Sequence, residues 1–263
     1  MLRGADAATA GFLLGMRRGE ILTHNLVNAD TPGYRTEDPV VRGFAAVLFE
    51  EIRRTRRPLG EGVLSAYVAG TRSRFTPGPL VETGRPLDFA FEGEALRPAG
   101  AVPFFLLVDP EGNLYATRDG RFVPGEDGFL YGPGGLRVAD DAGNPIYLGG
   151  AAFTVGPGGI LDVSGRIVRL GVVSLGGEAP APLASLDRVG GGVFRLTDVA
   201  VGGPWLPPEG VTVRNGVYEG SNVDLGRELP ALMANLRFAE FSGRSLASAY
   251  EALQRLSDAA GRW

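Results

Sequence analysis

The chain has 263 residues, of which 44% are hydrophobic and 21% are charged, and this balance predicts a folded protein. Its formal net charge of −4 excludes the overall positive field of a nucleic-acid binder, and the lack of cysteine excludes disulfides, thiolate metal sites and thiol catalysis. No run reaches the ~20 apolar residues that span a bilayer, so we expect no membrane insertion.

The N-terminal segment predicts a helix with one apolar stripe. Gly11, Gly15 and Gly19 lie on a line beside this stripe, and each internal glycine costs about 1 kcal/mol of helix stability relative to alanine. Three such residues in a line predict the close approach of a neighbouring backbone. The turn formers from Asn28 to Gly33 predict that the helix ends close to Asn28. The stripe itself comprises Leu2, Ala5, Thr9, Phe12, Met16, Gly19, Thr23 and Leu26.

The same segment has only a faint likeness to a signal peptide. Asp6 interrupts its apolar run, and no convincing cleavage site precedes Arg17. If the protein leaves the cytoplasm, we expect a route that removes no ordinary signal.

Residues 36–76 are expected to form a linker or an extended segment. All 26 positively charged side chains of the protein are arginine, which we attribute to codon or genome bias. One local basic cluster consists of Arg53, Arg54, Arg56 and Arg57. No aromatic residues are interleaved with it, so we interpret it as a solvated face or linker.

The middle of the chain changes to the pattern of β-strands. Short β-favouring runs are separated by turn sequences in which glycine or asparagine adopts positive φ, such as those at 109–113 and 141–144. No crossover helix intervenes, so an antiparallel sheet or a partly closed barrel is expected. The predicted strands are Phe104–Val108, Leu114–Arg118, Leu136–Val138, Ile146–Leu148, Phe153–Val155, Ile160–Val163 and Ile167–Leu175.

The C-terminal segment predicts a second, longer helix with an apolar stripe. Ser221, Asn222 and Asp224 are candidate caps at its start. Pro230 predicts either a kink or a helix that begins near that residue. The stripe steps by four and three residues and comprises Leu225, Leu229, Leu232, Leu236, Ala239, Gly243, Leu246, Tyr250 and Leu253.

These elements together predict an α+β protein with a mainly antiparallel β domain flanked by two terminal helices. The helices lie far apart in sequence and have little other helix to cover them, so we expect them to pair as a coiled-coil-like domain. The predicted domains are a discontinuous helical assembly domain (1–35 and 215–263), a linker (36–76) and an outer β domain (77–214). The predicted assembly interface comprises Leu2, Phe12, Met16, Leu26, Leu225, Leu229, Leu232, Leu236, Leu246, Tyr250 and Leu253.

Four motifs carry a family resemblance that covers nearly the whole chain. Residues 25–35 read NLVNADTPGYR, a helix end followed by a Thr-Pro-Gly-Tyr turn, and this segment resembles the N-terminal signature of bacterial flagellar rod and hook proteins. Residues 83–93 (TGRPLDFAFEG), 115–122 (YATRDGRF) and 215–225 (NGVYEGSNVDL) follow in the family's order. The signature residues are Asn25, Leu26, Asn28, Thr31, Pro32, Gly33, Tyr34, Ser221, Asn222, Val223 and Asp224.

The resemblance implies a structural role in the flagellum. Members of this family build its axial shaft, with their terminal helices in an inner domain around a central channel and their β domains outside. It implies as partners other copies of the chain, other rod or hook subunits and the flagellar type III export apparatus. The implied location is the extracytoplasmic basal body, reached without signal cleavage.

Two departures from the family pattern affect the details. Residues Ala95–Pro103 intervene before the Phe104-Phe105 strand and are expected to form a surface loop. Pro230 interrupts the terminal helix of the family, which affects how that helix packs. The length suits a rod protein better than a longer hook protein, and it leaves proximal and distal rod subunits open.

Catalytic chemistry has little support in the residues. His24, the only histidine, lies in the last turns of the first predicted helix, where a hydrogen bond at the helix end explains it better than a catalytic triad. Acid pairs at Asp109/Glu111, Glu126/Asp127 and Asp140/Asp141 leave glycoside hydrolysis open, although all lie in turn sequence.

No spacing indicates a metal site, and Gly156–Gly159 lacks the Lys-Ser/Thr end of a phosphate loop. We therefore expect no enzymatic activity, no catalytic residue, no metal and no cofactor. Two alternatives to a rod subunit stay open. One is a hook-type axial subunit, and the other is a secreted β-rich protein that hydrolyses or binds cell-wall glycan.

Overall fold

The computed structural model describes residues 2–43, 66–93, 102–175, 186–196, 205–207 and 210–260. The arginine cluster at 53–57 and residues 95–101 of the predicted surface loop lie outside these ranges. The chain divides into two compact units. Unit 1 comprises Met1–Val27, Glu37–Arg74 and Asp224–Trp263, and unit 2 comprises Asn28–Thr36 and Phe75–Val223. Both ends of the chain therefore belong to one unit, whereas the domain limits expected from the sequence stay a prediction.

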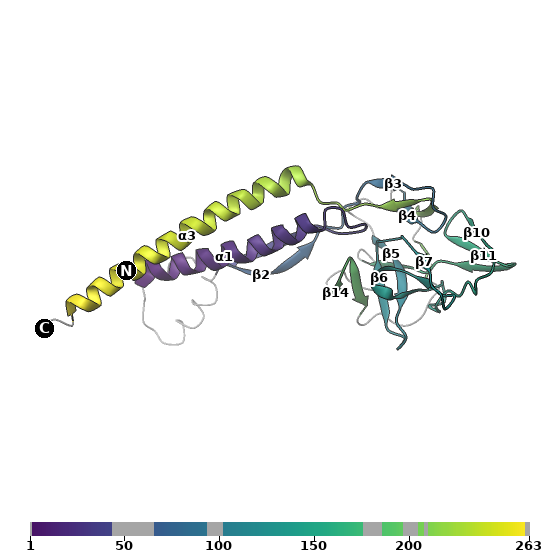
Figure 1. The fold of residues 1–263 in the computed structure, drawn as a ribbon, viewed down its shortest axis with the longest axis horizontal. Coiled ribbons are helices and arrows are strands. Elements are labelled where there is room, and N and C mark those ends of the chain that lie inside the picture. Colours follow the sequence, from purple (N-terminus) through teal and green to yellow (C-terminus); the bar gives the residue numbers. More distant parts are fainter. Residues whose placement is uncertain are drawn as a thin grey trace. The chain divides into compact units, whose positions relative to one another are not determined.

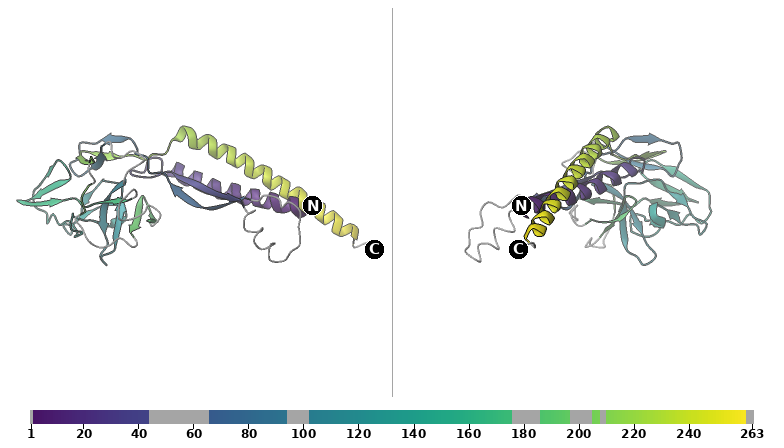
Figure 2. Two further views of the ribbon diagram at one scale, coloured as in Figure 1. Left: turned by 180° about the vertical axis from the view of Figure 1, so that it is seen from behind. Right: turned by 60° about the vertical axis from the view of Figure 1, so that its left-hand side comes forward.

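Two long helices dominate unit 1, α1 (Leu2–Val27) and α3 (Leu225–Ala260). Figures 1 and 2 show them side by side and antiparallel. A Cβ placed on Gly15 would lie 3.0 Å from the Cβ of Ala239, and one placed on Gly11 would lie 3.0 Å from the Oγ of Ser242. The line of glycines therefore faces α3, which confirms the close approach predicted from their spacing. Coiled-coil packing of this pair stays a prediction.

Helix α3 begins five residues before Pro230, so a helix start at that proline is wrong. The Asp224 carboxylate accepts a hydrogen bond from the backbone N–H of Gly226 at 2.9 Å, and the Asp224 carbonyl accepts one from Glu228 at 2.9 Å. Asp224 is thus the N-cap, as predicted. Because this cap fixes the first turn, the helix tolerates the N–H that Pro230 does not supply.

Helix α1 ends at Val27, next to the predicted end at Asn28. Two strands complete unit 1, β1 (Glu37–Gly43) and β2 (Ala66–Ser73), which pair antiparallel and contact α1. A register shift between Val40 and Val41 marks a bulge in this ladder. No helix in the described ranges is long and apolar enough to cross a membrane.

Unit 2 consists of antiparallel sheets, as the sequence predicts, and the described pairings include no parallel ladder. The strands of its largest sheet run in the order β14 (Leu186–Gly190), β15 (Val193–Leu196), β6 (Leu114–Thr117), β5 (Val102–Val108), β9 (Arg137–Val138), β8 (Leu130–Tyr131) and β7 (Val123–Pro124), with β13 (Val172–Leu175) also paired to β5. The smaller sheets are β10 (Phe153–Gly156) with β11 (Ile160–Val163) and β12 (Arg166–Arg169), β16 (Thr212–Asn215) with β4 (Phe89–Glu92), and β17 (Val217–Glu219) with β3 (Leu80–Glu82).

The run from Ile167 to Leu175, expected as one strand, is two strands in different sheets. The chain turns at Gly171, where a Cβ would lie 2.4 Å from the carbonyl oxygen of Asp140. Only glycine permits this approach of two backbones. The expected strand Ile146–Leu148 is reduced to an isolated bridge between Tyr147 and Phe129.

The core of unit 2 lies on both faces of β5. Phe104, Leu106 and Val108 point into one apolar cluster, whereas Phe105 and Leu107 point into the other. This explains why the strand is a continuous apolar run without alternation. Aromatic rings fill the second cluster: Phe105 stacks on Phe91 with centroids 4.2 Å apart and meets the edge of Phe122 at 5.3 Å. Such ring pairs stabilise a core beyond their buried area.

Candidate functional site

The leucine stripe predicted on α3 is not the face that α1 covers. The residues of α3 that meet the glycines of α1 are Asn235, Ala239 and Ser242, all of them buried. The stripe lies about a quarter turn away, and within unit 1 it remains largely uncovered. We call its main part, Leu225, Leu229, Leu232, Leu236 and Tyr250, the leucine face.

The leucine face is exposed along much of α3. Leu225, Leu229, Leu236 and Tyr250 keep 46%, 50%, 52% and 60% of their surface exposed, and Leu232 is half-buried. Met233 and Phe241, outside the predicted interface, are also exposed. An exposed apolar surface of this kind on a soluble protein is typical of an interaction site.

The predicted interface residues of α1 lie on different parts of the helix. Met16 is 48% exposed, and Leu26 and Phe12 are half-buried. The Phe12 ring is 3.5 Å from the position of a Cβ on Gly243, so Phe12 contributes to the pairing with α3. The side chain of Leu2 lies outside the described residues.

An open groove of about 500 Å³ runs between the two helices beside the leucine face. Met16 of α1 and Leu232 and Leu236 of α3 line it. Leu246 and Leu253 follow Ala239 at intervals of seven residues and lie on the side of α3 that faces α1, where they are half-buried. The structure thus divides the predicted interface into residues that pair within the chain and residues that do not.

The first signature residue, Asn25, joins three segments of unit 1. Its side-chain Nδ2 donates to the Glu37 carbonyl at 3.0 Å and to the Glu228 carboxylate at 3.2 Å. Its Oδ1 accepts from the Glu37 N–H at 2.9 Å. Because the Asn25 amide is buried and bonded as a backbone amide would be, it fixes the start of β1 and the first turn of α3 against α1. His24 beside it is half-exposed, with Nδ1 3.9 Å from the Glu37 carboxylate.

In unit 2, the Thr-Pro-Gly-Tyr signature forms a tight turn against the β-sheets. The Thr31 hydroxyl donates to the Asn28 side chain at 3.2 Å, and the Gly33 N–H donates to the Glu219 carbonyl at 2.8 Å. Gly33 has φ +67°, and a Cβ there would lie 2.4 Å from the backbone nitrogen of Asp119. The conserved-looking glycine therefore has both a conformational and a steric reason.

Replacing Gly33 by alanine is expected to lower the free energy of unfolding by more than about 2 kcal/mol, because left-handed strain and a backbone clash add up. Urea-induced unfolding measures the change. Gly84→Ala is the matched control, since Gly84 has φ +68° but no atom within 4 Å of its Cβ position. It tests the strain alone, about 1–2 kcal/mol. Equal losses for the two variants would contradict the predicted clash.

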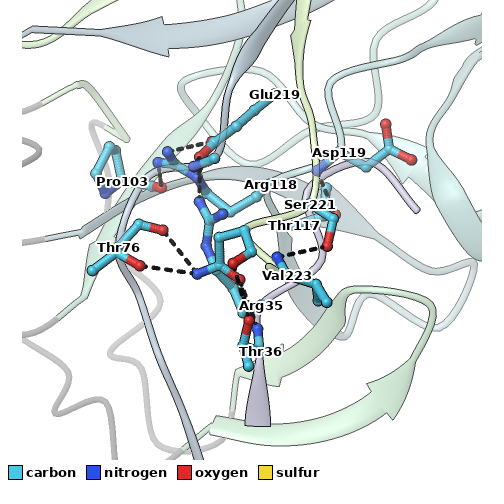
Figure 3. A network of polar contacts seen from close by, with 12 residues as sticks. Arg35, Thr36, Thr76, Pro103, Thr117, Arg118, Asp119, Glu219, Ser221 and Val223 are labelled. Atoms are coloured by element: carbon cyan, nitrogen blue, oxygen red, sulfur yellow. Dashed lines mark hydrogen bonds and ion pairs between the residues drawn. The ribbon is translucent and has the colours of Figure 1, made fainter. Parts of the chain in front are cut away.

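Three charged residues from distant segments meet in the centre of this site (Figure 3). The Arg35 Nη2 donates to Glu219 Oε1 at 2.6 Å, and the Arg118 Nε donates to Glu219 Oε2 at 2.8 Å. Arg118 also donates to the Pro103 carbonyl at 2.7 Å and lies over the Phe91 ring at 4.8 Å. The three side chains are at most 1% exposed. We call Arg35, Arg118 and Glu219 the buried charge cluster.

The pKa values in this cluster follow from burial and from the neighbouring charges. Burial lowers the pKa of Arg118 to about 10; the Glu219 carboxylate raises it, and the Arg35 charge lowers it further. Burial alone raises the pKa of Glu219, but the Arg118 and Arg35 charges and the Gly78 N–H more than offset this, so its pKa is lowered. All three groups are therefore charged at neutral pH.

The second signature binds the first through Asn222. Its Oδ1 accepts from the Thr36 N–H at 2.7 Å and from the Thr36 hydroxyl at 2.8 Å, while its Nδ2 donates to the Thr76 carbonyl at 3.0 Å. The Asn222 N–H donates to the Tyr34 carbonyl, and Tyr34 is buried with the Arg188 guanidinium over its ring at 4.6 Å. Ser221 Oγ accepts from the Val223 N–H at 3.2 Å. Residues 31–36 and 217–223 thus interlock.

The buried charge cluster is a feature that the sequence analysis missed. Each of its residues lies in one of the four motifs, and this position is the only signal in the sequence. Charge pairing between Arg35 and Glu219, which are 184 residues apart, leaves no periodic pattern.

The candidate acids for hydrolysis act as acceptors in turns. Asp109 accepts from Asn113 and Tyr115, Asp127 from Tyr131 and Arg137, and Asp140 from the N–H groups of Ala142 and Asn144. Burial raises the pKa of Asp109, but its hydrogen bonds from Asn113 and Tyr115 outweigh this and lower it. The Tyr131 hydroxyl, chiefly, lowers the pKa of Asp127. A general acid of a glycosidase has a raised pKa, the opposite direction.

Comparisons with known proteins were made by sequence. No family model matches the chain. It is 30% identical over 239 residues to the flagellar basal-body rod protein FlgF of Escherichia coli, covering 87% of this chain and 86% of that protein. It is 27% identical over 246 residues to the FlgF of Caulobacter vibrioides, covering 92% and 86%. It is 24% identical over 260 residues to the rod protein FlgG of Borreliella burgdorferi, covering 94% of each.

Proposed function

The chain belongs to the family of flagellar basal-body rod proteins, and on this premise we propose that it is a structural subunit of the bacterial flagellar rod. It polymerises through its terminal helices into the axial shaft that transmits torque from the motor to the hook. Its role is structural and not catalytic. Its partners are further copies of itself, other rod or hook subunits and the export apparatus that delivers it to the basal body without signal cleavage.

The observation that carries this proposal is the leucine face of α3. Unit 1 uses glycine, alanine and short polar residues to pair its two helices, and it leaves the larger apolar side chains uncovered. Burial of an apolar side chain contributes about 1.5–3 kcal/mol, so a row of such side chains supplies the driving force for assembly. In the rod, residues 1–35 and 215–263 form the assembly domain, and neighbouring helices supercoil with it.

Deleting this chain from the cell tests the proposal. We expect cells without it to be non-motile and their isolated basal bodies to lack a complete rod. Basal bodies from cells that carry a tagged copy should contain the chain. Complete rods in its absence would contradict a structural role.

A second assay separates assembly from glycan chemistry. Purified protein is incubated with peptidoglycan, and the soluble fragments are followed. We expect no release above the background. Release that Asp127→Asn abolishes would overturn the non-catalytic proposal.

A further inference from the structure

Three polar side chains interrupt the side of α3 that faces α1. Glu228, Asn235 and Ser242 lie seven residues apart, and each is 6% exposed. Seven residues are close to two helical turns, so the three side chains lie on one line of the helix. This line is the seam between the two helices.

Each of these side chains meets a different group on α1. Glu228 accepts a hydrogen bond from Asn25 at 3.2 Å. Asn235 Nδ2 donates to the backbone carbonyl of Gly15 at 2.8 Å, and this bond is buried. Ser242 packs against Gly11, where a Cβ would come within 3.0 Å of its Oγ.

The apolar residues of the seam define its register only weakly. Leu232, Ala239 and Leu246 are also spaced by seven, so a slide of α3 by seven residues places an apolar residue opposite Gly15 again. The glycines of α1 are spaced by four and present a smooth surface without side chains. The polar residues differ at each step, so a slide separates each of them from its partner.

Asn235 is the most demanding of the three. The Gly15 carbonyl already lies within the hydrogen-bonded ladder of α1, and the lack of a side chain at Gly15 and Gly19 exposes it to the Asn235 amide. The Oδ1 of Asn235 is buried without a hydrogen-bond partner among the described residues. A buried acceptor without a partner reduces stability, and such polar residues persist at helix interfaces where they define register.

We propose that Asn235 is the specificity-determining residue of the helix pair and holds α1 and α3 in a single antiparallel register. By fixing the register, it also fixes which residues of the two helices line the open groove, where Met16 meets Leu232 and Leu236. The inference concerns the chain by itself and does not depend on the proposed function.

Disulfide trapping in the full chain tests this proposal, because the natural sequence contains no cysteine. The native-register reporter is Gly15→Cys with Ala239→Cys. The shifted reporters are Gly15→Cys with Leu232→Cys and Gly15→Cys with Leu246→Cys. All three leave Glu228, Asn235 and Ser242 in place. Mild oxidation followed by non-reducing electrophoresis gives the rate of cross-linking for each pair.

We expect the native pair to cross-link about tenfold faster than either shifted pair, the factor that corresponds to one hydrogen bond. Adding Asn235→Leu should reduce this preference to about threefold or less while circular dichroism shows that the helices are retained. Asn235→Ala should act in the same direction without adding bulk. Arg237→Leu adds a leucine to an exposed position outside the seam and should leave the preference unchanged.

Three results would overturn the proposal. The first is a preference for the native register that persists in both Asn235 variants, since packing of Gly15 on Ala239 would then define the register. The second is a failure of the native pair to cross-link in the otherwise natural sequence. The third is an equal loss of preference with Arg237→Leu.

Discussion

Replacing Glu219 by glutamine will lower the free energy of unfolding by about 3–5 kcal/mol, because it leaves two buried guanidinium groups without their carboxylate. No other single change in unit 2 discussed above carries a larger expected cost. Urea-induced unfolding measures it in a Trp263→Phe background, where the fluorescence of buried Trp205 is the only tryptophan signal. Replacing Arg118 instead would confound charge with lost packing against Phe91.

The matched control for Glu219→Gln is Glu82→Gln. Glu82 also accepts a hydrogen bond from an arginine, Arg214 at 2.7 Å, but its side chain is 75% exposed. Solvent screens such pairs, so the free energy of unfolding should change little. A similar loss in both variants would show that burial of Glu219 contributes nothing.

Acid should remove the difference between the natural protein and Glu219→Gln. The pKa of Glu219 is lowered in the folded protein from an ordinary value of 4.5. Its charge therefore stabilises the fold fully above about that pH, and the stabilisation is lost as the pH falls through the lower, folded pKa. Unfolding curves should differ by a constant amount from pH 6 to 8 and converge at lower pH. A difference that grows on acidification would contradict the assigned direction.

Replacing Leu236 by aspartate will abolish incorporation into the rod while the separate chain still folds. Leu236 is 52% exposed in unit 1, so a carboxylate there stays hydrated until another surface covers it. Covering an unpaired charge costs several kcal/mol, more than the burial of one leucine contributes. Swimming motility and the content of purified basal bodies measure incorporation. Circular dichroism of the purified chain verifies folding.

Arg237→Asp is the control for this effect. It introduces the same side chain one position along α3, on an exposed side away from both the seam and the leucine face. We expect incorporation to persist. Unimpaired assembly of Leu236→Asp would exclude the leucine face as the contact, and equal failure of both variants would show that the contact is not confined to that face. Leu232→Asp, at the edge of the groove, should behave like Leu236→Asp.

Local signals in the sequence predicted the helix ends and the turns. Asp224 caps α3 as expected, α1 ends one residue before Asn28, and Gly112 and Gly143 adopt the positive φ predicted for their turns. These features depend on neighbouring residues, which periodicity and turn chemistry describe.

The sequence did not predict which neighbour covers which face. The leucines of α3 form the strongest periodic signal, yet the glycines of α1 pack on the smaller residues beside them. Periodicity identifies an apolar stripe but not the surface that covers it. For the same reason the break at Gly171 was missed, because it depends on the distant carbonyl of Asp140.

The signature residues of the assembly site were found as motifs, and their contacts were not. Asn25, Gly33 and Asn222 each have a structural partner that no spacing rule supplies. The use of the leucine face in assembly stays a prediction until the Leu236 experiment is made.

The bond between Arg35 and Glu219 has a consequence for the order in which the protein folds. During translation Arg35 leaves the ribosome 184 residues ahead of its counter-ion. Closing so long a loop is slow, and until Glu219 arrives the arginine has no reason to leave water. The nascent chain therefore completes unit 2 only after most of it has been synthesised. A late fold of this kind keeps the polypeptide extended for as long as possible after translation begins.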